Sequence, residues 1–160
     1  AYIGNDFPSN YDIHVGFVTM DFTETVRYAL DEPASAAEWA LLQMIPTHQG
    51  YVRLGPEKRR FAISMFHSMH CMDLIRRALL DYDNIQASPL HVQHCINYIR
   101  QSLLCNADAM LEPGDFLEWN ITLRDGDSRH SRQCRDWSEV YRKVDANYRQ
   151  WGSWTEAHGV

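Results

Sequence analysis

The sequence predicts a mainly α protein with short β elements, an α+β fold in which two central helices are related by a pseudo-two-fold internal repeat. Three features predict it: a repeated segment with helical spacing mid-chain, a second helical pattern near the end, and turn-broken aromatic and β-branched residues at the start. The chain has 160 residues, 45% of them hydrophobic and 22% charged, which suits one packed domain and is too short for two. We therefore predict a single domain over residues 1–160.

Short strands and loops are expected in the first sixty residues, because proline and glycine interrupt the aromatic and β-branched positions. Gly50 and Gly55, for example, flank the strand-like residues 51–54.

A helix is predicted over Ser35–Met44. Ser35 is the expected N-cap, and Glu38 takes the reciprocal position of a capping box. Trp39 and Leu42 then face inward.

The centre of the chain contains an internal repeat. Residues 64–80 align without a gap with residues 88–104, and each copy contains the pattern HxxHC. Such a pattern arises by chance about once in a hundred chains of this size, and twice far more rarely. The identical pairs are Ser64/Ser88, His67/His91, His70/His94, Cys71/Cys95, Ile75/Ile99, Arg76/Arg100, Leu79/Leu103 and Leu80/Leu104.

Both copies are predicted to be helices, with Ser64 and Ser88 as N-caps and Pro89 in the first helical position. At about 100° per residue, the two histidines and the cysteine of each copy share one face, and Arg76 and Arg100 point the opposite way. The apolar residues expected in the core are Leu74, Ile75, Leu79, Leu80, Ile99, Leu103 and Leu104.

The two motifs meet only in some arrangements of the helices. In a simple antiparallel hairpin with a tight turn, His70 would stand about 18 Å above the turn and His94 about 9 Å, so the motifs would miss each other. A pseudo-two-fold axis through the motifs brings them together and requires the connector, residues 81–87, to run back about 15 to 20 Å. Seven extended residues reach roughly 24 Å, so we predict an extended connector.

Two imidazoles one turn apart can chelate a metal ion, and two such faces supply four nitrogens. The candidate ligands are His67, His70, His91 and His94. Imidazole suits copper, which leads the affinity order of divalent first-row metals, and mixed sulfur and nitrogen copper sites are known as well. A structural zinc site, made of four His or of two His with two Cys, is the main alternative. For His14, His48 and His158 we adopt the ordinary interpretation of a hydrogen-bonded core histidine.

Three further residues lie near the candidate ligands. Tyr98 shares the ligand face of the second helix, where it could line a pocket, donate a hydrogen bond, act as a redox relay or simply pack in the core. Asp73 and Asn97 lie one turn beyond the second histidine of each pair and could orient imidazole N–H groups, with solvent exposure as the alternative.

Four cysteines, Cys71, Cys95, Cys105 and Cys134, allow three disulfide connectivities. We favour disulfides for most of them, since an oxidising compartment would not preserve idle thiols. The tripeptide Asn120-Ile121-Thr122 is a sequon for N-linked sugar at Asn120, which agrees with a secretory route.

The C-terminal third contains two further predicted elements. Residues 115–123 alternate enough to predict a strand, and residues 135–151 have helical spacing. The tail after Trp151 is expected to be irregular.

Charge and hydropathy exclude two classes of partner. A net charge of −6 and a pI of about 5.7 give no basic surface for nucleic acid or anionic lipid. No apolar stretch approaches the roughly 20 residues that span a bilayer.

Three segments resemble the doubled HxxHC signature of the fungal UstYa-like proteins, also called the DUF3328 family: residues 67–72 (HSMHCM), residues 91–108, and Cys134-Arg-Asp-Trp137. The likeness extends from about Tyr51 to Trp137. Members act in fungal secondary-metabolite pathways, many on ribosomally made peptides. The resemblance implies a copper-dependent oxidase that cyclises, hydroxylates or dehydrogenates a peptide or small-molecule precursor, with a copper-dependent halogenase as the alternative.

Carried over by position, the resemblance implies that the four motif histidines bind one or two copper ions, with dioxygen as co-substrate. Many relatives have a histidine where this chain has Arg132, and His130 lies nearby, so a role for His130 stays open. The resemblance also implies the lumen of the secretory pathway (ER or Golgi) or secretion. Relatives commonly begin with a transmembrane helix, and this chain opens with Ala1, so we expect a lumenal domain trimmed of its anchor. A homodimer is compatible with the sequence.

Overall fold

The computed structural model describes residues 2–23, 25–44, 49–111 and 128–159, and the statements below concern those residues. The predicted fold class, mainly α with short β elements, is confirmed. In chain order the elements are β1 (Phe17–Thr23), α1 (Ser35–Met44), β2 (Tyr51–Leu54), β3 (Arg59–Ala62), α2 (Ser64–Leu80), the 3₁₀ helix η1 (Ile85–Ala87), α3 (Pro89–Asn106), β4 (Ser128–Arg135) and α4 (Trp137–His158).

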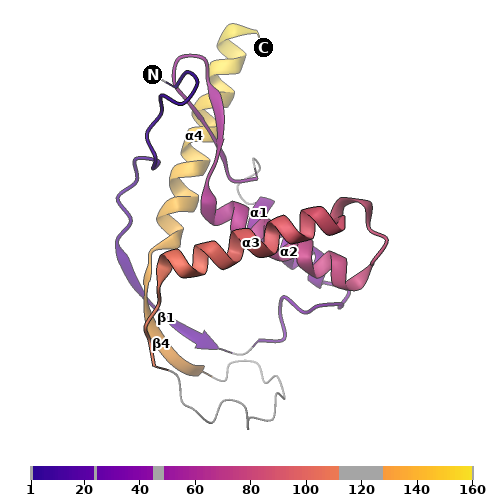
Figure 1. The fold of residues 1–160 in the computed structure, drawn as a ribbon. Coiled ribbons are helices and arrows are strands. Elements are labelled where there is room, and N and C mark those ends of the chain that lie inside the picture. Colours follow the sequence, from indigo (N-terminus) through magenta and orange to yellow (C-terminus); the bar gives the residue numbers. More distant parts are fainter. Residues whose placement is uncertain (1, 24, 45–48, 112–127, 160) are drawn as a thin grey trace.

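The long helix α4 forms one side of the molecule, and α2 and α3 lie side by side and reach away from it (Figure 1). β1 and β4 form an antiparallel ribbon at the N-terminal end of α4, with register from Phe17↔Arg135 to Phe22↔His130. The hairpin of β2 and β3 packs along the other half of α4, where the side chain of Asn147 exchanges hydrogen bonds with the backbone of Arg53.

Helix α2 contributes to two separate hydrophobic clusters, and this shared role fixes its position. In one cluster, Phe66 packs with Val52 of β2 and Val144 of α4. In the other, Cys71 and Leu74 pack against η1 and against Cys95 of α3. Because α2 is held from both sides, the face of α2 that carries His67, His70 and Cys71 is held in a defined orientation toward α3.

The pairing of the two motif helices agrees with the predicted repeat, but the connector differs from the prediction. Residues 81–87 are not extended: they form a turn followed by η1. The side chain of Asp81 accepts a hydrogen bond from the amide of Asp83, and that of Asn84 accepts one from the amide of Gln86. These local hydrogen bonds favour a compact turn over an extended segment.

The predicted helix caps are largely wrong. The hydroxyl of Ser35 bonds back to Glu32 inside the preceding turn, and the carboxylate of Glu38 accepts a hydrogen bond from the amide of Tyr28 at 2.7 Å. Ser64 is the first residue of α2, not its cap. Ser88 does precede α3 with Pro89 at its start, but the Ser88 hydroxyl makes no capping bond.

Three other expectations need correction. The segment after Trp151 is helical up to His158, because α4 continues until the left-handed Gly159. β3 and β4 were not predicted. Several leucines expected in the core are exposed instead, such as Leu79 (70% exposed) and Leu103 (68% exposed), because no described element covers the outer face of α2 and α3. The strand predicted over 115–123 lies outside the described residues.

Within the described ranges, no helix combines the length and the apolar character that crossing a membrane requires.

We predict that Gly50→Ala destabilises the protein, because Gly50 has a φ of +73° and a Cβ there would lie 2.2 Å from the side chain of the buried Phe66. The left-handed backbone costs about 1–2 kcal/mol for an L-residue, and the overlap about 1–3 kcal/mol more. Gly152→Ala, in open space inside α4, is the matched control and should add about 0.5–1 kcal/mol of stability. Urea denaturation measures both; equal midpoints for Gly50→Ala and wild type would contradict the packing described here.

Candidate metal centre

The four motif histidines come together between α2 and α3. His67 and His70 lie in the first half of α2, and His91 and His94 in the first half of α3. The ring centroids are 5.6 Å apart for His67 and His94 and 5.9 Å apart for His70 and His91. The predicted convergence of the two motifs is therefore present in the structure.

The distances also agree with the predicted pseudo-two-fold axis. A two-fold operation that exchanges the two copies of the repeat turns the His67–His94 pair into the His91–His70 pair, and their separations differ by only a few tenths of an ångström. The pairs within each helix match equally well, with 6.5 Å for His67 and His70 and 6.3 Å for His91 and His94. The repeat in the sequence is thus a repeat in space.

Two cysteines lie next to the histidine cluster. Cys71 and Cys95 are both fully buried and belong to one hydrophobic cluster. Burial raises the pKa of the Cys71 thiol to about 12, and the neighbouring Cys95 acts in the same direction. His67, Cys71 and His94 each offer one ligand atom, and these atoms lie within 4.8 Å of one another. A metal ion could therefore be held by nitrogen and sulfur together.

The surroundings of His67 and His70 favour neutral imidazoles. Burial lowers the pKa of His67, and His94 and His91 lower it further. Burial also lowers the pKa of His70, and the repulsion from His91, His67 and Arg77 outweighs the opposing effect of Asp73. A neutral ring retains a nitrogen lone pair, which coordination of a metal ion requires.

Two of the four histidines are anchored through Nδ1. His70 Nδ1 lies 3.1 Å from Oε1 of Gln43 in α1, and His91 Nδ1 lies 3.0 Å from the backbone carbonyl oxygen of Gln86 in η1. In both cases the other ring nitrogen, Nε2, is the one left for a metal ion.

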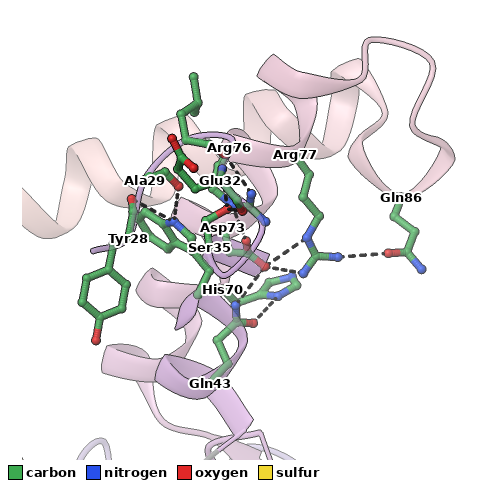
Figure 2. Close-up of polar contacts among 12 residues, drawn as sticks. Tyr28, Ala29, Glu32, Ser35, Gln43, His70, Asp73, Arg76, Arg77 and Gln86 are labelled. Atoms are coloured by element: carbon green, nitrogen blue, oxygen red, sulfur yellow. Dashed lines mark hydrogen bonds and ion pairs between the residues drawn. The ribbon is translucent and has the colours of Figure 1, made fainter. Parts of the chain in front are cut away.

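Behind His70 lies a network around a buried carboxylate (Figure 2). Asp73 accepts hydrogen bonds from Nε of Arg76 at 3.0 Å, from Arg77, and from Nε2 of Gln43 at 3.2 Å. Burial raises the pKa of the Asp73 carboxyl, but the hydrogen bonds from Arg77 and Arg76 outweigh it and leave the pKa below its ordinary value. Arg76 also donates to the carbonyl oxygen of Leu30, which ties the segment before α1 to α2.

A cavity of about 440 Å³ opens beside the histidine cluster. His67 and His70 form part of its wall. The rest of the lining is apolar and neutral polar, apart from Arg77. The other lining residues are Ala40, Gln43, Gln49, Tyr51, Ala62, Ile63, Phe66 and Gln86. A volume of this size is within the range of small-molecule sites.

The other candidate residues differ in their placement. The ring of Tyr98 packs 4.1 Å from that of His67, so it does belong to the cluster. Asn97 is exposed and donates to the backbone carbonyl oxygen of Gln93 in its own helix, so it orients no imidazole. Asp73 is buried and acts through Gln43. Arg132 pairs with Asp108 at 2.7 Å.

The remaining histidines and cysteines lie away from the cluster or outside the residues that the structure describes. His14 and His158 are exposed, so neither is the core histidine we expected; the ring of His158 stacks on Trp154. His48 and the sequon at Asn120 lie outside the described residues, and of His130 only the backbone in β4 is described. All four cysteines carry free thiols, with Cys105 exposed and Cys134 half-buried; the disulfides stay a prediction.

Three residues around the cluster were not predicted from the sequence: Gln43, Gln86 and Arg77. Gln43 carries no motif, and only the packing of α1 against α2 brings it to His70. Gln86 acts partly through its backbone, which leaves no signal in the residue type.

The comparisons with known proteins give one family match. The family model described as "Mycotoxin biosynthesis protein UstYa" matches residues 43–158, which include both HxxHC motifs and most of the chain. Comparisons with curated proteins and with solved structures give no match.

We predict that the cysteines of the reduced, native protein differ sharply in reactivity toward iodoacetamide. Cys105 is exposed and should be alkylated, whereas Cys71 and Cys95 should react at least about 100-fold more slowly, since the thiolate is the nucleophile and both sulfurs are buried. Peptide mass spectrometry after timed labelling measures the rates. Equal rates would contradict this placement, and a cross-linked Cys71–Cys95 peptide in unreduced protein would establish the disulfide.

Proposed function

The chain belongs to the UstYa family of mycotoxin biosynthesis proteins, and from that premise we propose that it is a copper-dependent oxidase that modifies a peptide or small-molecule precursor of a secondary metabolite. The observation that supports the proposal is the clustering of four imidazoles from two helices, whose neighbouring ring centroids lie 5.6–6.5 Å apart. Among the described residues, the group of metal donor atoms that lie within 4.8 Å of one another, His67, Cys71 and His94, belongs to this cluster.

The residues present fit a copper ion. Nitrogen from neutral imidazole is a preferred donor for copper, and the lowered pKa of His67 and His70 keeps these donors free of protons at neutral pH. Nδ1 of His70 and of His91 is occupied by a hydrogen bond, which directs Nε2 toward the cluster. Copper bound there would supply one-electron redox chemistry, with dioxygen as the oxidant.

The protein itself would position the substrate. The cavity beside His67 and His70 has an apolar part around Phe66 and Ile63 and a polar part that includes Gln49. A substrate in this cavity would be held by apolar contact and by amide hydrogen bonds, with its reacting bond at the His67 and His70 side of the cluster.

Tyr98 packs against the ring of His67 and is not part of the lining of that cavity. Burial raises the pKa of its phenol, and the charge of Cys71 adds to this, so Tyr98 is a neutral hydrogen-bond donor. We assign it the packing of His67 as its main role. Tyr98→Phe separates this role from a redox one, because it keeps the ring and removes the hydroxyl.

We further propose that the protein works in the lumen of the secretory pathway or after secretion. In that compartment its cysteines would form disulfides and Asn120 would carry an N-linked sugar. The even cysteine set and the sequon support this proposal. A homodimer is part of the same proposal, and size-exclusion chromatography with light scattering tests it.

We predict that alanine at any of His67, His70, His91 or His94 lowers copper affinity by more than about 100-fold and abolishes substrate oxidation, since loss of a ligand exceeds the 10–100-fold effect of changes around the ligands. Elemental analysis gives the number of ions per chain, electron paramagnetic resonance shows their donors, and competition with a chelator gives the affinity. His158→Ala, at the far end of α4, is the control and should leave all three unchanged.

Wild-type protein that takes up no copper, or copper-free protein that still oxidises its substrate, would overturn the proposal. The assay is run with and without chloride or bromide, and a product that gains the mass of a halogen assigns halogenation to the same site.

A zinc-stabilised structural module is the second candidate, and the mixed group of His67, Cys71 and His94 is the observation that favours it. We predict that a chelator leaves the helical circular dichroism at 25 °C unchanged, because the hydrophobic cluster of Cys71, Leu74, Ala87 and Cys95 holds α2 and α3 together. A module that depends on zinc would unfold under the same treatment.

A further inference from the structure

We propose that Gln43 is a positioning residue that sets the tautomer and ring orientation of His70, as the last member of a hydrogen-bonded relay from Arg76 and Arg77 through Asp73. The inference concerns the copper site and so rests on the proposed function for its consequence. The relay itself is a property of the protein without metal.

The relay starts at a carboxylate that cannot donate a hydrogen bond. Asp73 is 2% exposed and lies between two guanidinium groups: Arg76 donates to Oδ1 at 3.0 Å, and Arg77 donates to Oδ2 at 3.0 Å through Nε and again through Nη2. Two cations around one carboxylate hold it in the ionised form, which only accepts hydrogen bonds.

The state of Asp73 dictates the orientation of the Gln43 amide. Of its two polar atoms, only Nε2 can donate to the carboxylate, and it lies 3.2 Å from Oδ2 of Asp73. The carbonyl oxygen Oε1 must then be the atom that faces His70, 3.1 Å from Nδ1. An amide oxygen only accepts, so Nδ1 of His70 carries the proton and the lone pair is on Nε2.

Arg77 also contacts the residue that holds His91 of the second motif. Arg77 donates from Nη1 to Oε1 of Gln86 at 3.2 Å, and the backbone carbonyl oxygen of Gln86 lies 3.0 Å from Nδ1 of His91 (Figure 2 shows the Arg77–Gln86 contact). His91 is therefore also protonated on Nδ1. Among the described residues, neither His67 nor His94 has a hydrogen-bonded partner for its ring, so hydrogen bonds orient one histidine of each motif.

The test replaces Gln43 by methionine, which keeps the length of the side chain and removes both hydrogen bonds. The control is Gln101→Met, because Gln101 is an exposed glutamine of α3 whose amide bonds only to its own helix. Long-range proton–nitrogen NMR of the metal-free protein reads the tautomer of each ring. We expect His70 and His91 as Nδ1–H in the wild type and in Gln101→Met, and a shift of His70 alone toward Nε2–H in Gln43→Met.

With copper added, Gln43→Met should bind the ion about 10–100-fold more weakly than wild type, as measured by chelator competition, with a changed paramagnetic resonance spectrum. Gln101→Met should change neither. Wild-type His70 protonated on Nε2 would overturn the relay by itself, even if Gln43→Met failed to fold. An unchanged His70 in a folded Gln43→Met would overturn it equally. A wild type that has the expected tautomers but binds no copper would refute the copper proposal and leave the relay intact.

Discussion

The close contact of α2 and α3 around Cys71 and Cys95 is the constraint on which the rest of the site depends. Both cysteines are fully buried, and the pseudo-two-fold axis exchanges one with the other. Because the cysteine side chain is small, the two helix backbones can approach each other closely at this point. The motif histidines lie one and four residues before these cysteines, and their rings are brought to separations of 5.6–6.5 Å across and along the two helices. The candidate metal centre therefore follows from how the helices pack, and each motif alone would be a pair of histidines on a helix surface.

The second constraint is the buried charge at Asp73. A carboxylate with two guanidinium groups is costly to remove from water, and such a group contributes more to a single defined arrangement than to net stability. In this protein the charged group of Asp73, Arg76 and Arg77 links four segments. They are α2 itself, the chain before α1 through Leu30, α1 through Gln43, and η1 through Gln86. Three of these segments, α1, α2 and η1, line the cavity beside His67 and His70, so the same charges that orient α1 also shape that cavity.

The two halves of the repeat are alike in their ring geometry and unlike in their surroundings. His70 is held by a side chain from α1, while His91 is held by a backbone carbonyl of η1, and the cavity lies beside the α2 pair only. An ion bound symmetrically by four rings would still meet its substrate from one side. The repeat is therefore symmetric in its histidine rings and asymmetric in the cavity beside them.

Much of this could be predicted from the sequence, because the relevant signals are local. The helix over Ser35–Met44, the helices of the repeat, and the shared face of His67, His70 and Cys71 all follow from residue spacing and helical geometry, and the family resemblance follows from the doubled motif. What the sequence did not determine are contacts between segments far apart in the chain. Gln43 reaches His70 only because α1 packs on α2. β1 pairs with β4, which lies more than a hundred residues later in the chain. Leu79 and Leu103 are exposed because no described element covers them. The capping box predicted at Ser35 and Glu38 failed for the same reason, since both side chains bond to the preceding loop instead of to their own helix. Local spacing decides which residues share a face, and only the tertiary structure decides what that face meets.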